Sequence, residues 1–291
     1  MSSKENTIAD HKERLNRVLV YIEEHMDEPL KLDELASLAC FSPFHFHRIF
    51  AAHIGETIHE YIRRIRLERA AHKLSYTDEP ITSMALSAGY ETPAAFTKAF
   101  RQHFGQNPTE FKGIRKQQPP GAKLPDVYFT KQEGNIMQPE IRTMPEQRVL
   151  FVRKTGRYDK AAAEAWSTLM GFAYSRRLMG KNTKGIGISH DSPDITPEEK
   201  IRYDACITID KDIKPEGEAG VQTISGGRYA VFLHKGPYER FGETYNAIFS
   251  QWLPSSGETL RDAPCFEVYL NRDPRRTKPE NLRTEICIPI E

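Results

Sequence analysis

A helical unit occurs twice in the first part of this chain, and this repeat restricts the possible folds more than any other feature. Leu35-Ala36 precedes Cys40-Phe41 as Met84-Ala85 precedes Gly89-Tyr90, at an offset of 49 residues. At an offset of 50 residues the matching pairs are Phe46 with Phe96, Arg48 with Lys98, Phe50 with Phe100, His53 with His103, and Gly55 with Gly105. Such self-similarity indicates two copies of one supersecondary unit.

The apolar residues of each copy recur every three or four positions, which predicts helices. We expect helices over 32–39 and 43–53 in the first copy, and over 81–88 and 93–104 in the second. Gly89 lies in the second turn, where a positive φ is needed. A short helix, a tight turn and a second helix form a helix-turn-helix, whose second helix can enter a DNA major groove. A plain helical bundle is the alternative.

The second helix of each copy has an outward face that predicts DNA contacts. Phe46, Ile49 and Phe50 turn inward in the first copy, as Phe96 and Phe100 do in the second. The residues left toward solvent are Phe44, His45, His47 and Arg48 in the first copy, and Pro93, Ala94, Thr97 and Lys98 in the second. His and Arg side chains donate to guanine edges or phosphates. A basic set on the connecting helix is expected near the duplex backbone: Arg63, Arg64, Arg66 and Arg69.

The charge of this half is small for a DNA-binding domain. Residues 1–115 carry 15 Lys or Arg and 16 Asp or Glu, while residues 35–115 carry ten bases and seven acids. A strongly basic domain is the usual footprint of such proteins. We therefore expect modest affinity for double-stranded DNA, with help from a second subunit or from RNA polymerase.

One motif resembles the signature of the AraC/XylS family. It runs Ile81-x2-Met84-Ala85-x3-Gly89-Tyr90-x5-Phe96-x3-Phe100-x4-Gly105-x2-Pro108-x2-Phe111. The resemblance covers about residues 10–113. It implies seven helices, with two helix-turn-helix motifs joined by a long helix over about 58–74. It also implies base-facing positions at Phe44, His47, Arg48, Pro93, Ala94, Thr97 and Lys98. Relatives often have polar residues where this chain has Pro93 and Ala94, which favours backbone contacts by the second recognition helix.

The pattern changes in the second half. Residues 117–125 read Gln-Gln-Pro-Pro-Gly-Ala-Lys-Leu-Pro and predict a linker. Short apolar or alternating runs after residue 140 predict strands. Residues 148–158 are echoed by 228–238, so this half contains two β-α-β-β units. We predict an all-α domain over 8–115, a linker over 116–137 and an α+β domain over 138–291.

Alternation along two strands suggests a ligand surface. Glu267 and Tyr269 lie opposite Phe266, Val268 and Leu270, since successive side chains point to opposite faces. Glu285 and Cys287 likewise lie opposite Ile286 and Ile288. We expect the aliphatic faces to pack against helices, so that the two carboxylates, the phenol and the thiol share an uncovered surface. Solvated residues on the polar face of an antiparallel sheet are the alternative.

Aromatic residues from the helical stretches are expected to wall this surface. The predicted effector-binding set is Glu285, Glu267, Tyr269, Trp166, Tyr238 and Cys287. A carboxylate among rings is costly unless it is paired. A lipophilic cation supplies the pair, and each ring adds about 0.5–2 kcal/mol of cation–π attraction.

Three segments of this half resemble a GyrI-like domain, the effector-binding fold of multidrug-responsive regulators. They are Pro237-Tyr238, Phe266-Glu267-Val268-Tyr269-Leu270-Asn271, and 283–290 with the sequence Arg-Thr-Glu-Ile-Cys-Ile-Pro-Ile. The resemblance covers about 138–291 and implies a pseudo-symmetric sheet, a central groove and a buried glutamate. By motif this glutamate is Glu285, matched by Asp204 in the first repeat.

Two other functions stay open at this point. Some GyrI-like domains are similar to hydrolases of small electrophiles, with Glu285 and Tyr269 as the implied pair. A protein-interaction module is the third reading. The DNA-binding half favours a non-enzymatic regulator that senses a small, lipophilic cationic effector.

Other classes of protein are excluded by missing patterns. The four cysteines are far apart and form no CxxC pair, which excludes a Cys-based zinc finger and favours reduced thiols. Walker A, GxGxxG, HExxH and GxSxG motifs do not occur, so we expect no metal, no cofactor and no catalytic residues. The N-terminus is polar, and no apolar run approaches the roughly 18 residues of a membrane span. We expect a cytoplasmic protein without membrane contact.

Overall fold

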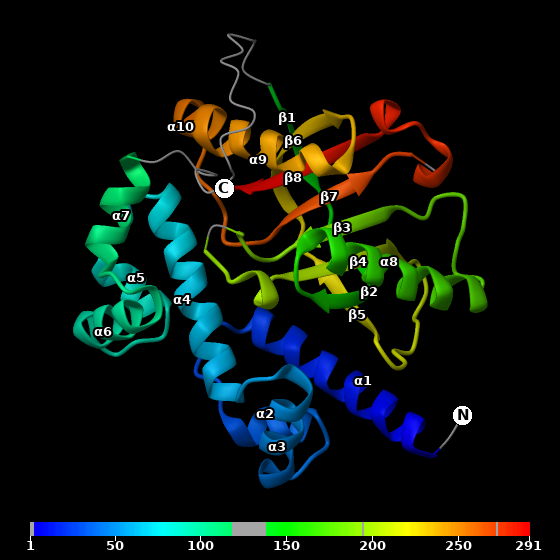
Figure 1. The fold of residues 1–291 in the computed structure, drawn as a ribbon, viewed down its shortest axis with the longest axis horizontal. Coiled ribbons are helices and arrows are strands. Elements are labelled where there is room, and N and C mark those ends of the chain that lie inside the picture. The colour runs from blue at the N-terminus through cyan, green and yellow to red at the C-terminus, as the bar shows by residue number, and fades with distance from the viewer. Residues whose placement is uncertain (1–2, 118–137, 194, 272) are drawn as a thin grey trace. The chain divides into compact units, whose positions relative to one another are not determined.

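A computed structural model describes residues 3–117, 138–193, 195–271 and 273–291. The chain divides into two compact units, Met1–Ile114 with Ile213–Gln222, and Arg115–Asp212 with Thr223–Glu291 (Figure 1). Most of the predicted linker, from residue 118 to 137, lies outside the described stretches. Within those stretches, no helix has the length and apolar character needed to cross a membrane.

The first unit is helical, as predicted. Its described helices are α1 (Ser3–Glu24), α2 (Leu32–Leu38), α3 (Pro43–Ile54), α4 (Ile58–Tyr76), α5 (Ile81–Ser87), α6 (Pro93–Phe104) and α7 (Pro108–Gln117). α3 and α6 are built alike: a hydroxyl of Ser42 or Thr92 accepts from the backbone of the first turn, and proline is the first helical residue. Both helices end at a left-handed glycine, Gly55 or Gly105.

Phenylalanine side chains hold each helix-turn-helix together. Phe46 and Phe50 of α3 are fully buried, as are Phe96 and Phe100 of α6. Their ring centroids are 5.8 and 5.5 Å apart within the two pairs. Gly89 has the expected positive φ of 76°, and a Cβ there would lie 2.6 Å from Nη1 of Arg66. Glycine therefore suits the backbone of the second turn and leaves the space that Arg66 occupies, although Cys40 adopts a positive φ of 54° at the equivalent turn.

The predicted basic set on α4 needs correction. Arg64 is buried and pairs with Glu56 at 2.7 Å and Glu68 at 3.0 Å. Arg66 donates to the backbone carbonyls of Met26 and Glu28. These two arginines stabilise the helical unit because α4 crosses its interior, so they are not placed for DNA phosphates.

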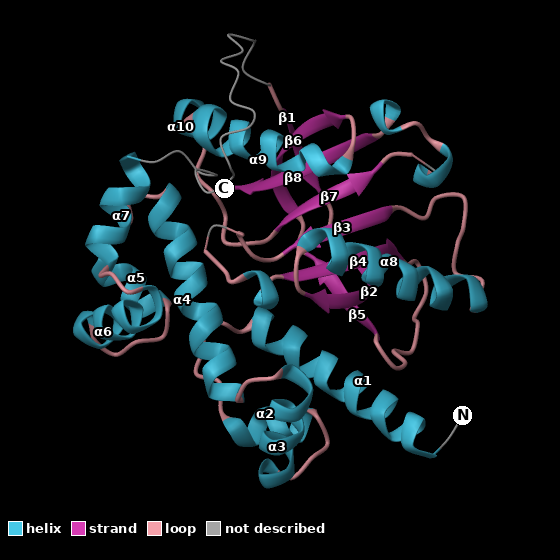
Figure 2. Ribbon diagram, viewed as in Figure 1, coloured by secondary structure: helices cyan, strands magenta, loops and turns pink. Residues whose placement is uncertain are grey.

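The described residues from 138 onward form one eight-stranded sheet, and most of its strands belong to the second unit. Its strands are β1 (Glu140–Met144), β2 (Gln147–Thr155), β3 (Gly185–Ser189), β4 (Arg202–Thr208), β5 (Ala219–Ile224), β6 (Gly227–Lys235), β7 (Cys265–Tyr269) and β8 (Arg283–Ile290). Their order is β1-β6-β8-β7-β3-β4-β2-β5. The helices of this unit are α8 (Tyr158–Ser175), α9 (Phe241–Ala247) and α10 (Leu253–Ser256), with a π-helical turn at Ile248–Trp252 (Figure 2).

The sheet is pseudo-symmetric about its central pair of strands. β3 and β7 pair antiparallel, with Gly187 directly opposite Glu267. Each repeat also has a leading strand that the sequence analysis did not predict, so each unit is β-β-α-β-β. These strands are exchanged: β1 pairs with β6 of the second repeat, and β5 lies beside β2 of the first.

Helices cover the face of the sheet that carries Glu267. α8 packs against β2 and β4. On the other repeat, the ring of Phe232 in β6 contacts Trp252, and His234 contacts Phe241 at the start of α9. Phe232 pairs with Ile286, which pairs with Glu267, so these side chains share one face.

Candidate functional site

The outward face of α3 is arranged as predicted for the residues that are described. His45 and Arg48 are exposed, and His47 is partly exposed. The side chain of Phe44 lies outside the described part of the structure. Base or phosphate contacts by this face remain a prediction.

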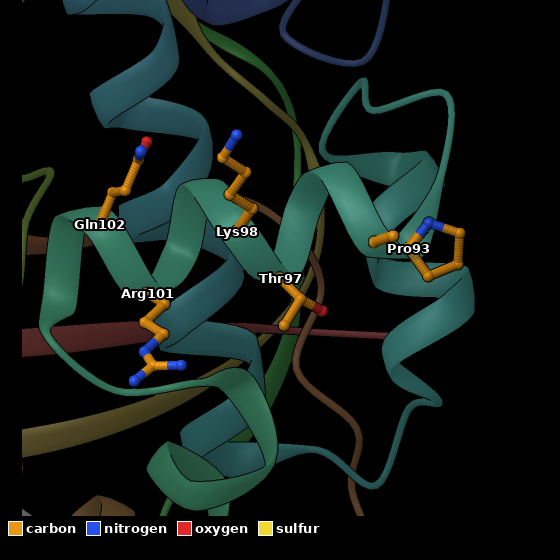
Figure 3. Close-up of a pocket in the computed structure, with 6 residues that line it drawn as sticks. Pro93, Thr97, Lys98, Arg101 and Gln102 are labelled. Carbon is orange, nitrogen blue, oxygen red and sulfur yellow. The ribbon is translucent and has the colours of Figure 1, made fainter.

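The outward face of α6 extends further than predicted. Pro93, Ala94 and Lys98 are exposed and Thr97 is partly exposed. These four residues line a shallow hollow together with Arg101 and Gln102, which the sequence analysis missed (Figure 3). The spacing of four residues from Thr97 and Lys98 is the signal that could have found them.

The predicted effector surface is divided between the two faces of the sheet. Glu267 of β7 is opposite Ile286 of β8, whereas Glu285 is opposite Val268. Directly opposed residues share a face, so Glu267 and Tyr269 lie on one face and Glu285 and Cys287 on the other. The prediction of a shared surface is therefore wrong, because alternation within each strand does not fix the register between strands.

The expected position of the helices is right for β8, whose Ile286 and Ile288 lie on the covered face, and wrong for β7. Glu267 and Tyr269 lie on the face that α8 and α9 cover, and Phe266 and Val268 lie on the other face. Both of these apolar side chains are nevertheless buried. Because both faces of the sheet bury apolar residues, hydrophobicity did not reveal which face the helices cover.

Glu267 lies at the centre of the covered face with only one of its oxygens satisfied. The residue is 2% exposed. Oε1 accepts hydrogen bonds from the hydroxyl of Tyr245 at 2.5 Å and of Ser189 at 3.1 Å. Oε2 has no hydrogen-bond partner in the described structure. Burial raises the pKa of Glu267 to about 7, although the two hydroxyls oppose the shift.

Aromatic side chains that contact one another lie beside this carboxylate. Nε1 of Trp166 donates to the hydroxyl of Tyr203 at 3.0 Å, and that hydroxyl lies 2.9 Å from the hydroxyl of Tyr269. The ring centroid of Tyr269 lies 5.5 Å from Trp166 and 5.4 Å from Tyr238. The structure thus brings together four of the predicted residues: Glu267, Tyr269, Trp166 and Tyr238.

Gly187 makes room for these polar groups. A Cβ at this position would lie within 2.8 Å of three oxygens, from Tyr203, Tyr269 and Glu267. We call the residues around Gly187 the Glu267 cluster: Glu267, Ser189, Tyr245, Tyr203, Tyr269, Trp166 and Tyr238. Of its members, Trp166, Tyr238, Tyr245 and Tyr269 are only partly buried.

Comparison with known proteins identifies the family to which the sheet-containing half of the chain belongs. A family model described as a GyrI-like small molecule binding domain matches residues 137–291. The chain belongs to the GyrI-like family. A helix-turn-helix domain model matches residues 35–113, and together they make the chain an AraC-type, DNA-binding transcription regulator with a GyrI-like domain.

Similar proteins match either both halves of this chain or only one of them. The right origin-binding protein of Escherichia coli K12 is 24% identical over 283 residues, which are 94% of this chain and 96% of that protein. Regulatory protein SoxS of Salmonella typhimurium is 32% identical over 102 residues, 35% of this chain and 95% of its own. The crystal structure of the EcmrR C-terminal domain, at 20% identity, covers 53% of this chain and 98% of its own with a TM-score of 0.46.

On the other face of the GyrI-like domain, Glu285 and Asp204 occupy equivalent positions. Glu285 is the glutamate that the resemblance singled out, yet it pairs at 2.8 Å with Arg142 of β1 near solvent. Asp204 is fully buried between Arg153 and His190, at 2.6 and 2.8 Å. Burial alone would raise the pKa of Asp204, but these two partners outweigh burial and hold the pKa below its usual range.

Two further consequences concern the residues of this second face. Glu285 and Tyr269 lie on opposite faces of the GyrI-like sheet, so the pair implied for a hydrolase does not form. Burial raises the pKa of the Cys287 thiol well above its usual range, which makes the thiol unreactive. The buried glutamate of this GyrI-like domain is Glu267.

The sequence analysis missed three members of the cluster. Ser189 and Tyr203 come from β3 and β4 of the first repeat, and Tyr245 comes from α9. The available signal was Gly185-x-Gly187 in a predicted strand. Glycine in the interior of a strand often marks a place where other groups approach closely.

Proposed function

We propose that this protein is a ligand-responsive transcription regulator that senses an organic cation at the Glu267 cluster. α3 and α6 bind adjacent major grooves of one DNA site, about one helical turn or ~34 Å apart. The small net charge of the helical half supports a second contact at the promoter, for which RNA polymerase is the partner we assign.

One observation carries the effector part of the proposal: the Oε2 atom of Glu267, which is buried among aromatic rings without a hydrogen-bond partner. A buried carboxylate needs a compensating charge. A lipophilic cation at this atom supplies that charge and contacts the ring faces of Trp166, Tyr238 and Tyr269. Glu285 is no candidate for this role because Arg142 already pairs with it.

We expect Glu267→Gln to weaken the binding of benzyltrimethylammonium by about 1–3 kcal/mol, the usual cost of losing a charge-assisted contact. Glutamine keeps the size of the side chain and its hydrogen bonds but removes the charge. Isothermal titration calorimetry on the full chain at pH 8 measures the effect. Glu285→Gln is the matched control, and its affinity for the cation should equal that of the wild type.

The affinity of the wild type should also depend on pH. The carboxyl of Glu267 is protonated below its pKa of about 7, and only the ionised form attracts a cation. Affinity should therefore rise about tenfold between pH 6 and pH 8 in the wild type, and stay constant in Glu267→Gln. Equal binding of benzyltrimethylammonium and its neutral isostere neopentylbenzene by the wild type would contradict the cation proposal.

The DNA-binding part predicts a separate effect at α3. Arg48→Ala should weaken specific binding by roughly 1–3 kcal/mol if its guanidinium reads a base edge. Gel-shift titrations with the promoter of the protein's own or a neighbouring gene measure this loss. Glu267→Gln serves as the control and should bind the same DNA normally; unchanged binding by Arg48→Ala would remove Arg48 from the readout.

A further inference from the structure

The second half of α6 carries two long polar side chains on its exposed face. Arg101 and Gln102 are exposed. They follow Thr97 and Lys98 by four residues, and Figure 3 shows the pairs as two rows along the helix. Both residues line the same hollow as Pro93 and Ala94.

The two recognition helices carry their polar residues at different positions along the helix axis. The repeat offset of 50 residues matches Arg101 and Gln102 with Ala51 and Ala52 of α3, so α3 has no polar side chain at these positions. In the first half, α3 carries the larger polar side chains. The same offset matches His45 with Ala95 and His47 with Thr97, while both helices begin with proline.

We propose that α6 reads base edges through Arg101 and Gln102. This inference rests on the proposed entry of α6 into a major groove. An arginine can donate two parallel hydrogen bonds to guanine O6 and N7, and a glutamine can pair with adenine N6 and N7. Pro93 and Ala94 have no side-chain donor, and they supply apolar contact of the kind that fits a thymine methyl group.

Two features of α6 support base contacts by the second half of the helix. The small side chains at its start allow the helix to approach the groove closely, while Arg101 and Gln102 lie about 12 Å further along its axis than Pro93 and Ala94. Neither of these two side chains has a hydrogen-bond or ion-pair partner among the described residues. Binding to DNA therefore breaks no internal contact of either residue.

Selection from a pool of randomised DNA duplexes with the full-length protein provides the test. The selected sequence and all of its single-base variants are then titrated with the wild type and with Arg101→Ala, Arg101→Lys and Gln102→Ala. Arg101→Ala should bind about tenfold more weakly and lose its preference at one G·C pair. Arg101→Lys should lose the same preference, because lysine keeps the charge but cannot form the bidentate contact. Gln102→Ala should lose its preference at one A·T pair.

Several results would overturn the inference. If Arg101→Lys keeps the wild-type base preferences while Arg101→Ala binds every sequence more weakly, Arg101 contacts phosphate only, and the salt dependence of binding should fall by about one ion. Unchanged binding by the alanine variants also overturns it and leaves the readout by α3 intact. If the wild type selects no sequence at all, the proposed groove binding fails together with this inference. Circular dichroism melting checks that each variant is folded.

Discussion

Asp204→Ala should lower the free energy of unfolding of the GyrI-like domain by about 3–5 kcal/mol. Asp204 is fully buried, and Arg153 beside it has a side chain only 7% exposed. Removal of the carboxylate takes away the counter-charge that Asp204 supplies to this buried guanidinium. Urea unfolding followed by tryptophan fluorescence measures the loss, since Trp166 and Trp252 both belong to this domain.

The pseudo-symmetry of the sheet offers a matched control for this experiment. Glu285 occupies the equivalent position in the second repeat, but its side chain is 18% exposed and that of its partner Arg142 is 34% exposed. Glu285→Ala should cost about 1 kcal/mol or less, because an ion pair near solvent contributes little. Equal losses in the two variants would show that the burial of the Asp204–Arg153 pair is not what makes it important.

Glu267→Gln should stabilise the ligand-free protein by about 3 kcal/mol more at pH 8 than near pH 4.5. The folded state holds the proton of Glu267 up to a pKa of about 7, whereas the unfolded chain releases it near 4.5. The folded state therefore binds more protons between these values, and wild-type stability falls as pH rises through this window. A shift of roughly 2.5 units corresponds to about 3 kcal/mol. Glutamine does not titrate and escapes this loss.

Urea unfolding at several pH values from 4.5 to 8 tests this second effect. The difference in stability between Glu267→Gln and the wild type should grow through the window and level off above pH 7. Glu285→Gln provides the comparison for a glutamate outside the cluster. Parallel curves for the wild type and Glu267→Gln would show that the empty site leaves the carboxylate hydrated.

Much of the fold follows from local patterns in the sequence. The repeat around Phe46 and Phe96, with proline at the start of each second helix and glycine at its end, predicted both helix-turn-helix motifs to within two residues. The leading strands β1 and β5 were not predicted. Both are short, β1 is mostly polar, and their pairing partners lie in the other repeat, so neither composition nor neighbouring sequence indicates them.

The candidate site shows where such reasoning fails. Alternation correctly separated Glu267 from Val268 and Glu285 from Ile286 within each strand. It could not give the register that places Glu267 opposite Ile286, which is set by long-range pairing. Nor could it predict that Glu267, rather than Glu285, is the unpaired carboxylate, because Arg142 comes from a strand more than a hundred residues away in the chain.

The exchange of β1 and β5 bears on the origin of this domain. A half-length ancestor with one repeat would have needed a second copy of itself to supply its missing edge strand. On the axis of that dimer, the positions of Gly187 and Glu267 would have held identical residues facing each other across β3 and β7. Two carboxylates so close would repel, and two glycines would offer no charge. A single chain that contains both repeats is free of this constraint, so one buried glutamate can lie opposite a glycine.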